Sequence, residues 1–138
     1  MAEREISPEV RAFLNEMAVP CVISTLRPDG SPITSATLYG FIGEDVVVST
    51  PAKRNKARNV REDPRVSFIV DTKEAPYRGI AIEGTAELTE DTNGNVLRSI
   101  LERYVSFESA LETSDRLESM GQRTILRIKP ERVRTWGF

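Results

Sequence analysis

The sequence predicts a small, mostly antiparallel β-barrel with two or three helices over its ends or its gap. Three observations lead to this fold class: about six short runs with strand character, turn residues between most of them, and one short helical crossover. Because a doubly wound parallel sheet alternates strands and helices throughout, a single crossover argues against it. We find no internal repeat, linker or low-complexity segment, and therefore predict one domain over residues 1–138.

The N-terminal part is predicted to contain a helix followed by a meander of three strands. Ser7 before Pro8 is a typical helix start, since the serine caps free amides and proline is tolerated at the first helical position. Apolar residues then recur at helical spacing until Met17. The turn sequence Arg-Pro-Asp-Gly separates two β-rich runs, which predicts a hairpin. The predicted elements are a helix over about 7–18 and strands over 21–26, 33–41 and 46–50.

The rest of the chain alternates strand and helix patterns. Thr50 before Pro51 repeats the cap-then-proline pattern of a helix start, and Pro64 ends that helix. Gly79 and Gly84 interrupt a long strand and indicate bulges or sharp bends, which are typical of a sheet that curls toward a barrel. The predicted elements are a helix over 51–63, strands over 65–70 and 77–88, a helix over 97–105 that extends less regularly to Leu117, and strands over 124–128 and 133–136.

The composition excludes several kinds of catalytic and metal site. The chain has no histidine, so histidine general bases, Ser-His-Asp triads and zinc sites that need imidazole are ruled out within one chain, and we predict no metal. The single cysteine, Cys21, lies in an apolar run and is predicted to be a buried structural thiol rather than a nucleophile. One cysteine cannot close a disulfide within the chain, which favours a reducing compartment.

Two further absences concern the membrane and nucleic acid. No run approaches the roughly 20 apolar residues of a membrane span, and the N-terminus lacks the apolar stretch of a signal peptide, so we predict a cytoplasmic protein. The net charge of -2 and the isoelectric point near 5.3 argue against nucleic acid as a partner, because duplex-binding domains have a basic excess.

The segment from Ser49 to Arg58 carries the strongest chemical signal. Its sequence, Ser-Thr-Pro-Ala-Lys-Arg-Asn-Lys-Ala-Arg, places four cations in the first turns of the helix that Thr50 is predicted to cap. The positive end of the helix macrodipole disfavours cations there unless an anion binds. Free backbone amides together with ammonium and guanidinium donors favour a phosphate site. A solvated basic helix face is the alternative interpretation, and the residues alone do not decide between the two.

Aromatic residues near the C-terminus are the other unusual feature. Trp136, the single tryptophan, and Phe138 lie at the chain end, where burial needs a core or a subunit interface. Packing is the simpler interpretation, and a ligand pocket across an interface is the alternative. Tyr77 and Arg78, which follow a polar loop, allow the same two interpretations.

Taken in order, these segments resemble the split-barrel superfamily related to pyridoxamine 5'-phosphate oxidase, and in particular its small members that depend on the deazaflavin coenzyme F420. The resemblance covers most of the chain from Val22 to Leu88, and it depends on the order and spacing of several stretches, since none suffices alone. These stretches are Val-Ile-Ser-Thr-Leu-Arg-Pro-Asp-Gly-Ser-Pro over 22–32, Val-Ser-Thr over 48–50, Lys-Ala-Arg-Asn-Val-Arg-Glu-Asp-Pro-Arg-Val-Ser over 56–67, Pro-Tyr-Arg over 76–78 and Ile-Glu-Gly-Thr-Ala-Glu-Leu over 82–88.

The resemblance implies a fold, an assembly and a cofactor site. The fold is a six-stranded antiparallel split β-barrel of the FMN-binding type, and two chains form a homodimer with the cofactor at the subunit interface. The ring system lies along the strand from Thr34 to Leu38, held largely by backbone groups, and Lys56 is the phosphate lysine. The implied cofactor-binding residues are Thr34, Ser35, Ala36, Thr37, Ser49, Thr50, Arg54, Lys56, Ala57 and Arg58, with Tyr77, Arg78 and Trp136 of the partner subunit.

The resemblance also bears on which cofactor is used. FMN-dependent oxidases of this superfamily carry an additional arginine and lysine at the positions of Ser35 and Gly40, and this chain lacks both. Fewer charges are then left for the compact phosphate of FMN, while Lys53, Arg58 and Arg61 remain for a longer anionic tail such as the polyglutamyl tail of F420. Coenzyme F420 is therefore expected in preference to FMN.

The expected reaction is hydride transfer between the cofactor and an unsaturated small organic substrate, with the cofactor supplying the reactivity. Tyr39, Tyr77 or a water supplies the proton in this hypothesis, and no catalytic residue is assigned. The alternatives are an FMN-binding oxidoreductase and a non-catalytic protein that binds or carries a flavin.

Overall fold

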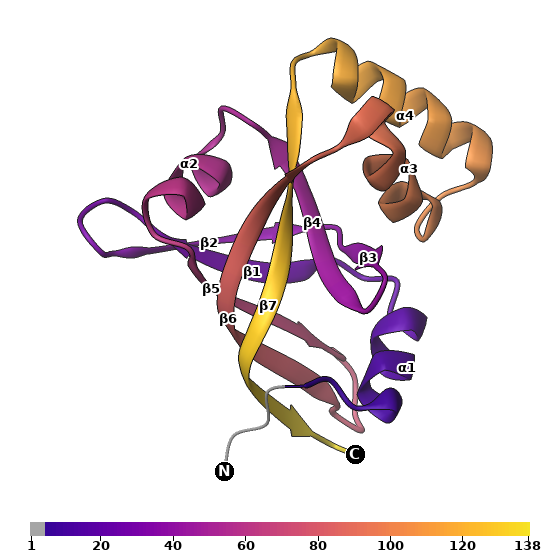
Figure 1. The fold of residues 1–138 in the computed structure, drawn as a ribbon. Coiled ribbons are helices and arrows are strands. Elements are labelled where there is room, and N and C mark those ends of the chain that lie inside the picture. Colours follow the sequence, from indigo (N-terminus) through magenta and orange to yellow (C-terminus); the bar gives the residue numbers. More distant parts are fainter. Residues whose placement is uncertain (1–4) are drawn as a thin grey trace.

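The computed structural model describes residues 5–138 (Figure 1). Within these residues, seven strands form one antiparallel sheet in the order β2-β1-β5-β6-β7-β4-β3. The strands are β1 (Cys21–Leu26), β2 (Pro32–Thr37), β3 (Gly40–Ile42), β4 (Asp45–Pro51), β5 (Arg65–Asp71), β6 (Gly79–Glu90) and β7 (Arg123–Trp136). The helices are α1 (Pro8–Glu16), α2 (Asn55–Glu62), α3 (Asn95–Glu102) and α4 (Phe107–Ser119), with a 3-10 turn (Thr92–Gly94) before α3. None of the helices in this part of the chain is long and apolar enough to cross a membrane.

The sheet curls around a core to which its inward side chains and α1 contribute (Figure 1). β1 and β5 alternate buried residues with half-buried or exposed ones, as strands with one face on a core do. Burying each large side chain of this core contributes roughly 1.5–3 kcal/mol. The largest fully buried side chains include Leu14, Ile23, Tyr39, Phe68 and Ile80. The predicted N-terminal helix is confirmed as α1, and the barrel-like, mostly antiparallel class is confirmed by the sheet order.

The strand predicted over 33–41 is two strands, because Tyr39 leaves the sheet to enter the core. Its ring is fully buried, and its hydroxyl donates to the carbonyls of Leu14 (2.7 Å) and Met17 (2.6 Å) at the end of α1. Arg103, at the end of α3, donates to the carbonyls of Tyr39 and Leu14 and lies over the tyrosine ring. β2 therefore pairs with β1, and β3 pairs with β4. The described chain has seven strands rather than the six that the resemblance implies.

Helix α2 begins later than predicted, and Thr50 does not cap it. Thr50 lies in β4, and Pro51 continues that strand opposite Arg123 of β7. The helix begins at Asn55 after Arg54, with no hydrogen bond from a capping side chain. The prediction was wrong because pairing with β7 overrides the local cap-then-proline signal, which is a weak prior against tertiary contacts.

The two C-terminal runs predicted as separate strands form one long strand, β7, which pairs along its length with β6. A bulge between Glu83 and Gly84 of β6 lies opposite the residues that separate the two runs in the sequence, and Gly84 pairs with Pro130. The predicted bulge at Gly84 is confirmed. Gly79 has a different role, because a side chain there would overlap the ring of Trp136.

The helical pattern over 97–117 belongs to two helices rather than one irregular helix. Asp91 accepts hydrogen bonds from the amides of Val96 and Leu97 at the start of α3, and Ser106 caps α4. The apolar residues of the two helices pack against each other beside β3 and β4. A second cap in the middle of the pattern is the local reason for the break.

Asp45 links β4 to β7 by two charged hydrogen bonds. Its Oδ2 accepts from Arg127 Nε (2.6 Å) and from Lys129 Nζ (2.7 Å). Burial alone would raise the pKa of Asp45, but the hydrogen bonds from Lys129 and Arg127 outweigh it and the pKa is lowered. A carboxyl group whose pKa is lower in the folded chain stabilises the fold above its unfolded pKa of about 3.9. That stabilisation is lost as the pH falls through the folded pKa.

Replacing Asp45 with asparagine is expected to lower the free energy of unfolding by about 1 kcal/mol at neutral pH, and by less in acid, where the native carboxyl is protonated. Urea unfolding of both proteins at about pH 7 and about pH 3 measures the two differences. Asp115→Asn, on the exposed side of α4, is the control and should change little at either pH. An equal loss for Asp45→Asn at both pH values would contradict this account.

Candidate functional site

Three cationic side chains from two distant segments gather at one end of the sheet, and we call them the cation cluster: Arg54, Lys56 and Arg123. The segment before α2 is held against the start of β7, because Pro51 pairs with Arg123 in the sheet. Arg54 precedes α2, and Lys56 lies in its first turn. Among residues 5–138, none of the three cations forms an ion pair, so the cluster carries unbalanced positive charge.

The members of the cation cluster repel one another and are partly withdrawn from water. Burial lowers the pKa of Lys56, and the charges of Arg54 and Arg123 lower it further, while Cys21 acts in the opposite direction. Burial also lowers the pKa of Arg123, with Asp91 opposing the effect and Arg54 adding to it. A bound anion would relieve the repulsion and give each cation a charge-assisted hydrogen bond.

Two serine hydroxyls complete the site. Lys56 donates from Nζ to Ser35 Oγ (3.2 Å), and Arg123 donates from Nε to Ser49 Oγ (3.1 Å). Each hydroxyl oxygen therefore accepts from a cation, and its own hydrogen has no acceptor among the described residues. Ser49 is only 8% exposed, so its surroundings fix its orientation. Cations and hydroxyl donors suit a phosphate group, and no carboxylate of the described residues forms an ion pair with the three cations.

β2 lies at one edge of the sheet, beside the cation cluster. It pairs with β1 on one side, so the other side of its backbone is free of sheet hydrogen bonds. Ser35 and Thr37 are half-buried, whereas Thr34 and Ala36 are exposed. The unpaired amides and carbonyls of an edge strand are available to a ligand. The strand can therefore hold a planar ring through its backbone while Lys56 holds a phosphate.

Arg58 lies apart from the cation cluster, in what we call the basic groove. This groove, of about 490 Å³, runs between the β1–β2 turn and α2. Arg27, Arg58 and Arg61 line it together with Glu62, and within residues 5–138 none of the three arginines forms an ion pair. The basic groove is a second surface that favours negative charge.

Burial excludes Cys21 and Tyr39 from chemistry at the site. Burial raises the pKa of the Cys21 thiol to about 12, and the thiol donates to the carbonyl of Thr37, so the predicted structural thiol is confirmed. Burial also raises the pKa of Tyr39 to about 12, and its hydroxyl is engaged by two backbone carbonyls. The expectation that Tyr39 supplies a proton is therefore wrong. Thr50 and Ala57, which the resemblance implies as cofactor contacts, are buried in β4 and α2.

Tyr77, Arg78 and Trp136 lie at the opposite end of β6 and β7 from the cation cluster. Trp136 pairs with Gly79, the first residue of β6. Arg123 is the first residue of β7 and Trp136 the last, which places them roughly 40 Å apart along an extended strand. Within one chain, these three residues do not reach Lys56 or β2.

Packing accounts for much of the aromatic group at the C-terminus. The ring centroids of Phe13 and Phe138 are 5.2 Å apart, and the Arg78 guanidinium lies 5.1 Å from the first and 4.6 Å from the second. The Trp136 ring covers the backbone of Gly79. Tyr77 differs from these residues, because 64% of it is exposed and it is accessible to another molecule.

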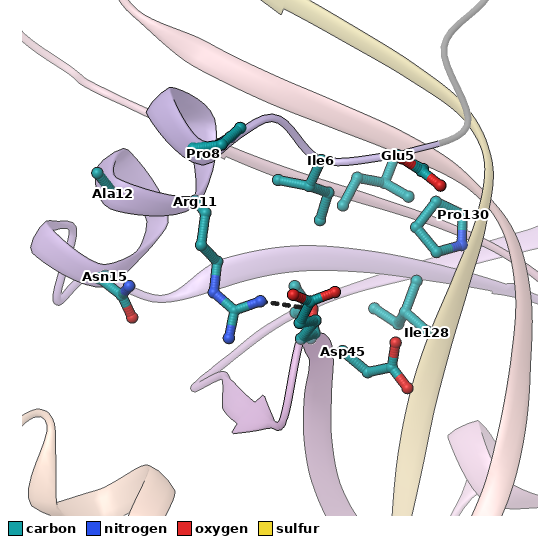
Figure 2. Close-up of a pocket in the computed structure, with 12 residues that line it drawn as sticks. Glu5, Ile6, Pro8, Arg11, Ala12, Asn15, Asp45, Ile128 and Pro130 are labelled. Carbon is teal, nitrogen blue, oxygen red and sulfur yellow. Dashed lines mark hydrogen bonds between the residues drawn. The ribbon is translucent and has the colours of Figure 1, made fainter.

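Another hollow, of about 510 Å³, lies between α1 and the start of β4 (Figure 2). Its apolar wall includes Ile6 and Ile128, and its rim carries Arg11 and Asp45. Both charged side chains are already engaged, since Arg11 donates to backbone carbonyls of the β3–β4 turn and Asp45 accepts from two cations of β7. The cation cluster is therefore the better candidate for an anionic ligand.

Sequence reasoning missed Arg123. It begins a strand that contains three further arginines, and nothing in the sequence separates it from Arg127 or Arg134. Its proximity to Lys56 follows from the pairing of β4 with β7, which joins segments about 70 residues apart. Only a correct prediction that these two strands pair could have identified Arg123 as part of the site.

Comparison with known proteins identifies the family of the chain and similar folds. A family model described as pyridoxamine 5'-phosphate oxidase matches residues 6–137. A conserved hypothetical protein from Mycobacterium tuberculosis is 32% identical, with a TM-score of 0.79, over 99% of this chain and 88% of that one. A protein described as an F420 reductase is 24% identical, with a TM-score of 0.72, over 93% and 98%. The heme storage protein HutZ from Vibrio cholerae is 20% identical, with a TM-score of 0.72, over 97% and 96%.

Proposed function

Because the chain belongs to the pyridoxamine 5'-phosphate oxidase family, we propose that it is an oxidoreductase that uses a flavin-type cofactor, and that this cofactor is the deazaflavin coenzyme F420. The observation that carries the proposal is the cation cluster, which has no carboxylate partner within the described residues and lies beside the free edge of β2. The structural similarity to an F420 reductase supports the choice of cofactor. The alternative within the same fold is FMN.

The residues at the cation cluster fit the phosphate of either cofactor. Arg54 and Lys56 supply positive charge, and Ser35 and Ser49 supply hydroxyl hydrogens that have no acceptor among the described residues. The free edge of β2 fits a planar ring with several hydrogen-bonding groups. When bound, the cofactor supplies hydride transfer, and the chain binds it, orients it and excludes water.

The basic groove favours F420 over FMN. FMN ends at its phosphate, whereas F420 continues into a tail of glutamates linked through their side chains. Arg27, Arg58 and Arg61 offer three guanidinium groups without ion pairs in the described chain, which suits the carboxylates of such a tail. Arg58 thus contributes to cofactor binding at the tail rather than at the phosphate.

The outward face of the sheet supports a homodimer. Val22 of β1, Ile69 of β5 and Ala81 of β6 are aligned across three strands on this face, around a hollow of about 200 Å³. Glu83 and Arg134 also line this hollow, and an apolar centre with a charged rim is typical of an interface. A second copy on this face is our proposed partner, and it would bring Tyr77 and Trp136 of the partner subunit to the cofactor.

The proposed reaction needs little side-chain chemistry from the chain. Tyr39 and Cys21 are buried and unavailable as proton donors. The chain's contribution is to hold the ring on β2 and the phosphate at Lys56 so that an electron-poor substrate meets the exposed face of the ring. The proton then comes from water or from Tyr77 of the partner subunit.

Turnover of the reduced cofactor tests the proposed function. The purified full chain is mixed with reduced F420 and a panel of electron-poor unsaturated compounds, and cofactor oxidation is followed by absorbance. Oxidation that depends on both the protein and one acceptor class is the expected result. Saturable binding without turnover of any acceptor would favour a carrier protein instead. Turnover with reduced FMN alone would assign the protein to the FMN-dependent members of the family.

Removing the arginine side chains of the basic groove should change the affinity for the two cofactors differently. The double variant Arg58→Gln/Arg61→Gln is expected to bind F420 about fivefold more weakly, since exposed charge pairs contribute modestly, and to bind FMN unchanged. Titration of both cofactors against both proteins by fluorescence measures the effect. Arg116→Glu, at an exposed position on α4, changes the net charge by the same amount as the double variant and is the control. Equal weakening of F420 and FMN would contradict the assignment of the groove to the tail.

A further inference from the structure

Arg123 differs from the other arginines of β7 in having no carboxylate partner. Within residues 5–138, Arg127 pairs with Asp45, and Arg132 and Arg134 pair with Glu83. Arg123 donates from Nε to Ser49 Oγ and forms no ion pair, although it is half-buried. A partly buried guanidinium without a counter-charge is costly unless a ligand supplies one.

Carboxylates lie near Arg123 without forming an ion pair with it: Glu90, Asp91 and Glu118 line a hollow of about 170 Å³ together with Arg123. The negative charge of Asp91 raises the pKa of Arg123. Both carboxylate oxygens of Asp91 accept backbone hydrogen bonds at the start of α3, from Val96 N (2.8 Å) and Leu97 N (2.9 Å). Arg54 is a cation and repels Arg123. Asp91 therefore offsets the charge of Arg123 only in part, because burial and Arg54 still lower the pKa of Arg123, and no described carboxylate forms an ion pair with it.

The hydrogen bond to Ser49 also fixes which donors remain. With Nε on Ser49, the two terminal nitrogens of Arg123 have no acceptor among the described residues. The hydroxyl of the buried residue Ser49 accepts from Arg123, and its own hydrogen has no acceptor among the described residues. A guanidinium with both terminal nitrogens free can bind a phosphate through two parallel hydrogen bonds.

We propose that Arg123 binds the anionic group of the ligand and positions the Ser49 hydroxyl as a further donor to it. Arg54, Lys56 and Arg123 then surround one anion from the α2 side and the β7 side, with Ser35 and Ser49 completing the donors. The inference rests on the proposed function for the identity of the cofactor, but its test requires only inorganic phosphate as the probe.

Phosphate binding to the native chain and three variants tests the role of Arg123. Calorimetric titration of the full chain with inorganic phosphate, at constant ionic strength set with sodium chloride, gives the Kd for each protein. Arg123→Gln is expected to raise the Kd by about tenfold or more, the scale of a lost charge-assisted hydrogen bond. Arg123→Lys should recover part of this loss, because it restores the charge but not the planar group. Arg116→Gln on α4 is the matched control and should leave the Kd unchanged.

A double-variant cycle separates positioning from stability. If Arg123 positions Ser49, then Ser49→Ala should cost less in the Arg123→Gln background than in the native chain. A merely structural role predicts a lower thermal midpoint without phosphate and an unchanged phosphate Kd, and that result would overturn the proposal. Should Lys56→Gln weaken phosphate binding while Arg123→Gln does not, the inference about Arg123 fails and the proposed function stands. Unchanged binding in both variants would remove the whole cation cluster from ligand binding.

Discussion

Replacing Gly84 with alanine should lower the free energy of unfolding by roughly 3 kcal/mol or more. Gly84 lies at the bulge between β6 and β7, and a Cβ there would overlap the carbonyl oxygen of Lys129. It would also stand 3.0 Å from the Lys129 carbonyl carbon and 3.1 Å from the amide nitrogen of Glu131. All three are backbone atoms of β7. The overlap can therefore be relieved only if β6 and β7, the longest strand pair in the sheet, move apart.

Chemical unfolding of the native chain and the Gly84→Ala variant measures this loss. Gly43→Asn is the matched control, because Gly43 has a φ of 58°, which asparagine tolerates, and open space around the position of a Cβ. The control should change the free energy of unfolding by less than about 1 kcal/mol. A loss for Gly84→Ala no larger than that of the control would mean that the bulge yields, and the close strand contact would be disproved.

Replacing Lys56 with alanine is expected to weaken cofactor binding by about 1.5–3 kcal/mol, or roughly 10- to 150-fold. The Lys56 ammonium is half-buried, is held by Ser35 and has no ion pair in the described chain, so it can give a strong charge-assisted hydrogen bond to a phosphate. Removing it takes away the cation closest to β2 and leaves the ligand phosphate with fewer donors.

Fluorescence titration of F420 into the native chain and the Lys56→Ala variant measures this weakening. Arg116→Ala is the control, because Arg116 is an exposed cation on α4 outside the proposed site and its loss removes the same charge. The control should alter the affinity by less than about threefold, in line with exposed charges in salt solution. Equal affinities of the native chain and the Lys56→Ala variant would exclude Lys56 from the phosphate site.

Local sequence signals predicted the parts of the fold that local physics determines. Ser7 before a proline marked the start of α1, alternation marked β5, and Gly84 marked a bulge. The failures have a common cause, which is contact with segments distant in sequence. Thr50 is in a strand because β7 pairs with it, and the run through Tyr39 breaks because α1 accepts its hydroxyl hydrogen bonds.

The residues of the candidate site also divide into those that the sequence predicted and those that depend on contacts between distant segments. Lys56 and Arg54 stand out in the sequence because cations at a helix start are electrostatically unfavourable without an anion. Ser35 and Ser49 came from the family resemblance, and the structure brings both into hydrogen-bond contact with the cation cluster. Arg123 could not be predicted, because its place in the cluster depends on the β4–β7 pairing. The roles of Tyr77 and Trp136 depend on a second chain and stay predictions.

The central claim is that the cation cluster and β2 hold a deazaflavin cofactor, and a side-by-side titration of the purified chain with coenzyme F420 and with FMN tests it most directly. The emission of Trp136 and of each cofactor reports binding. We predict saturable binding of F420 in the micromolar range or tighter, and weaker binding of FMN. Because both cofactors carry a phosphate, we expect the Lys56→Ala variant to bind each of them more weakly. Tighter binding of FMN, or no saturable binding of either cofactor, would contradict the account.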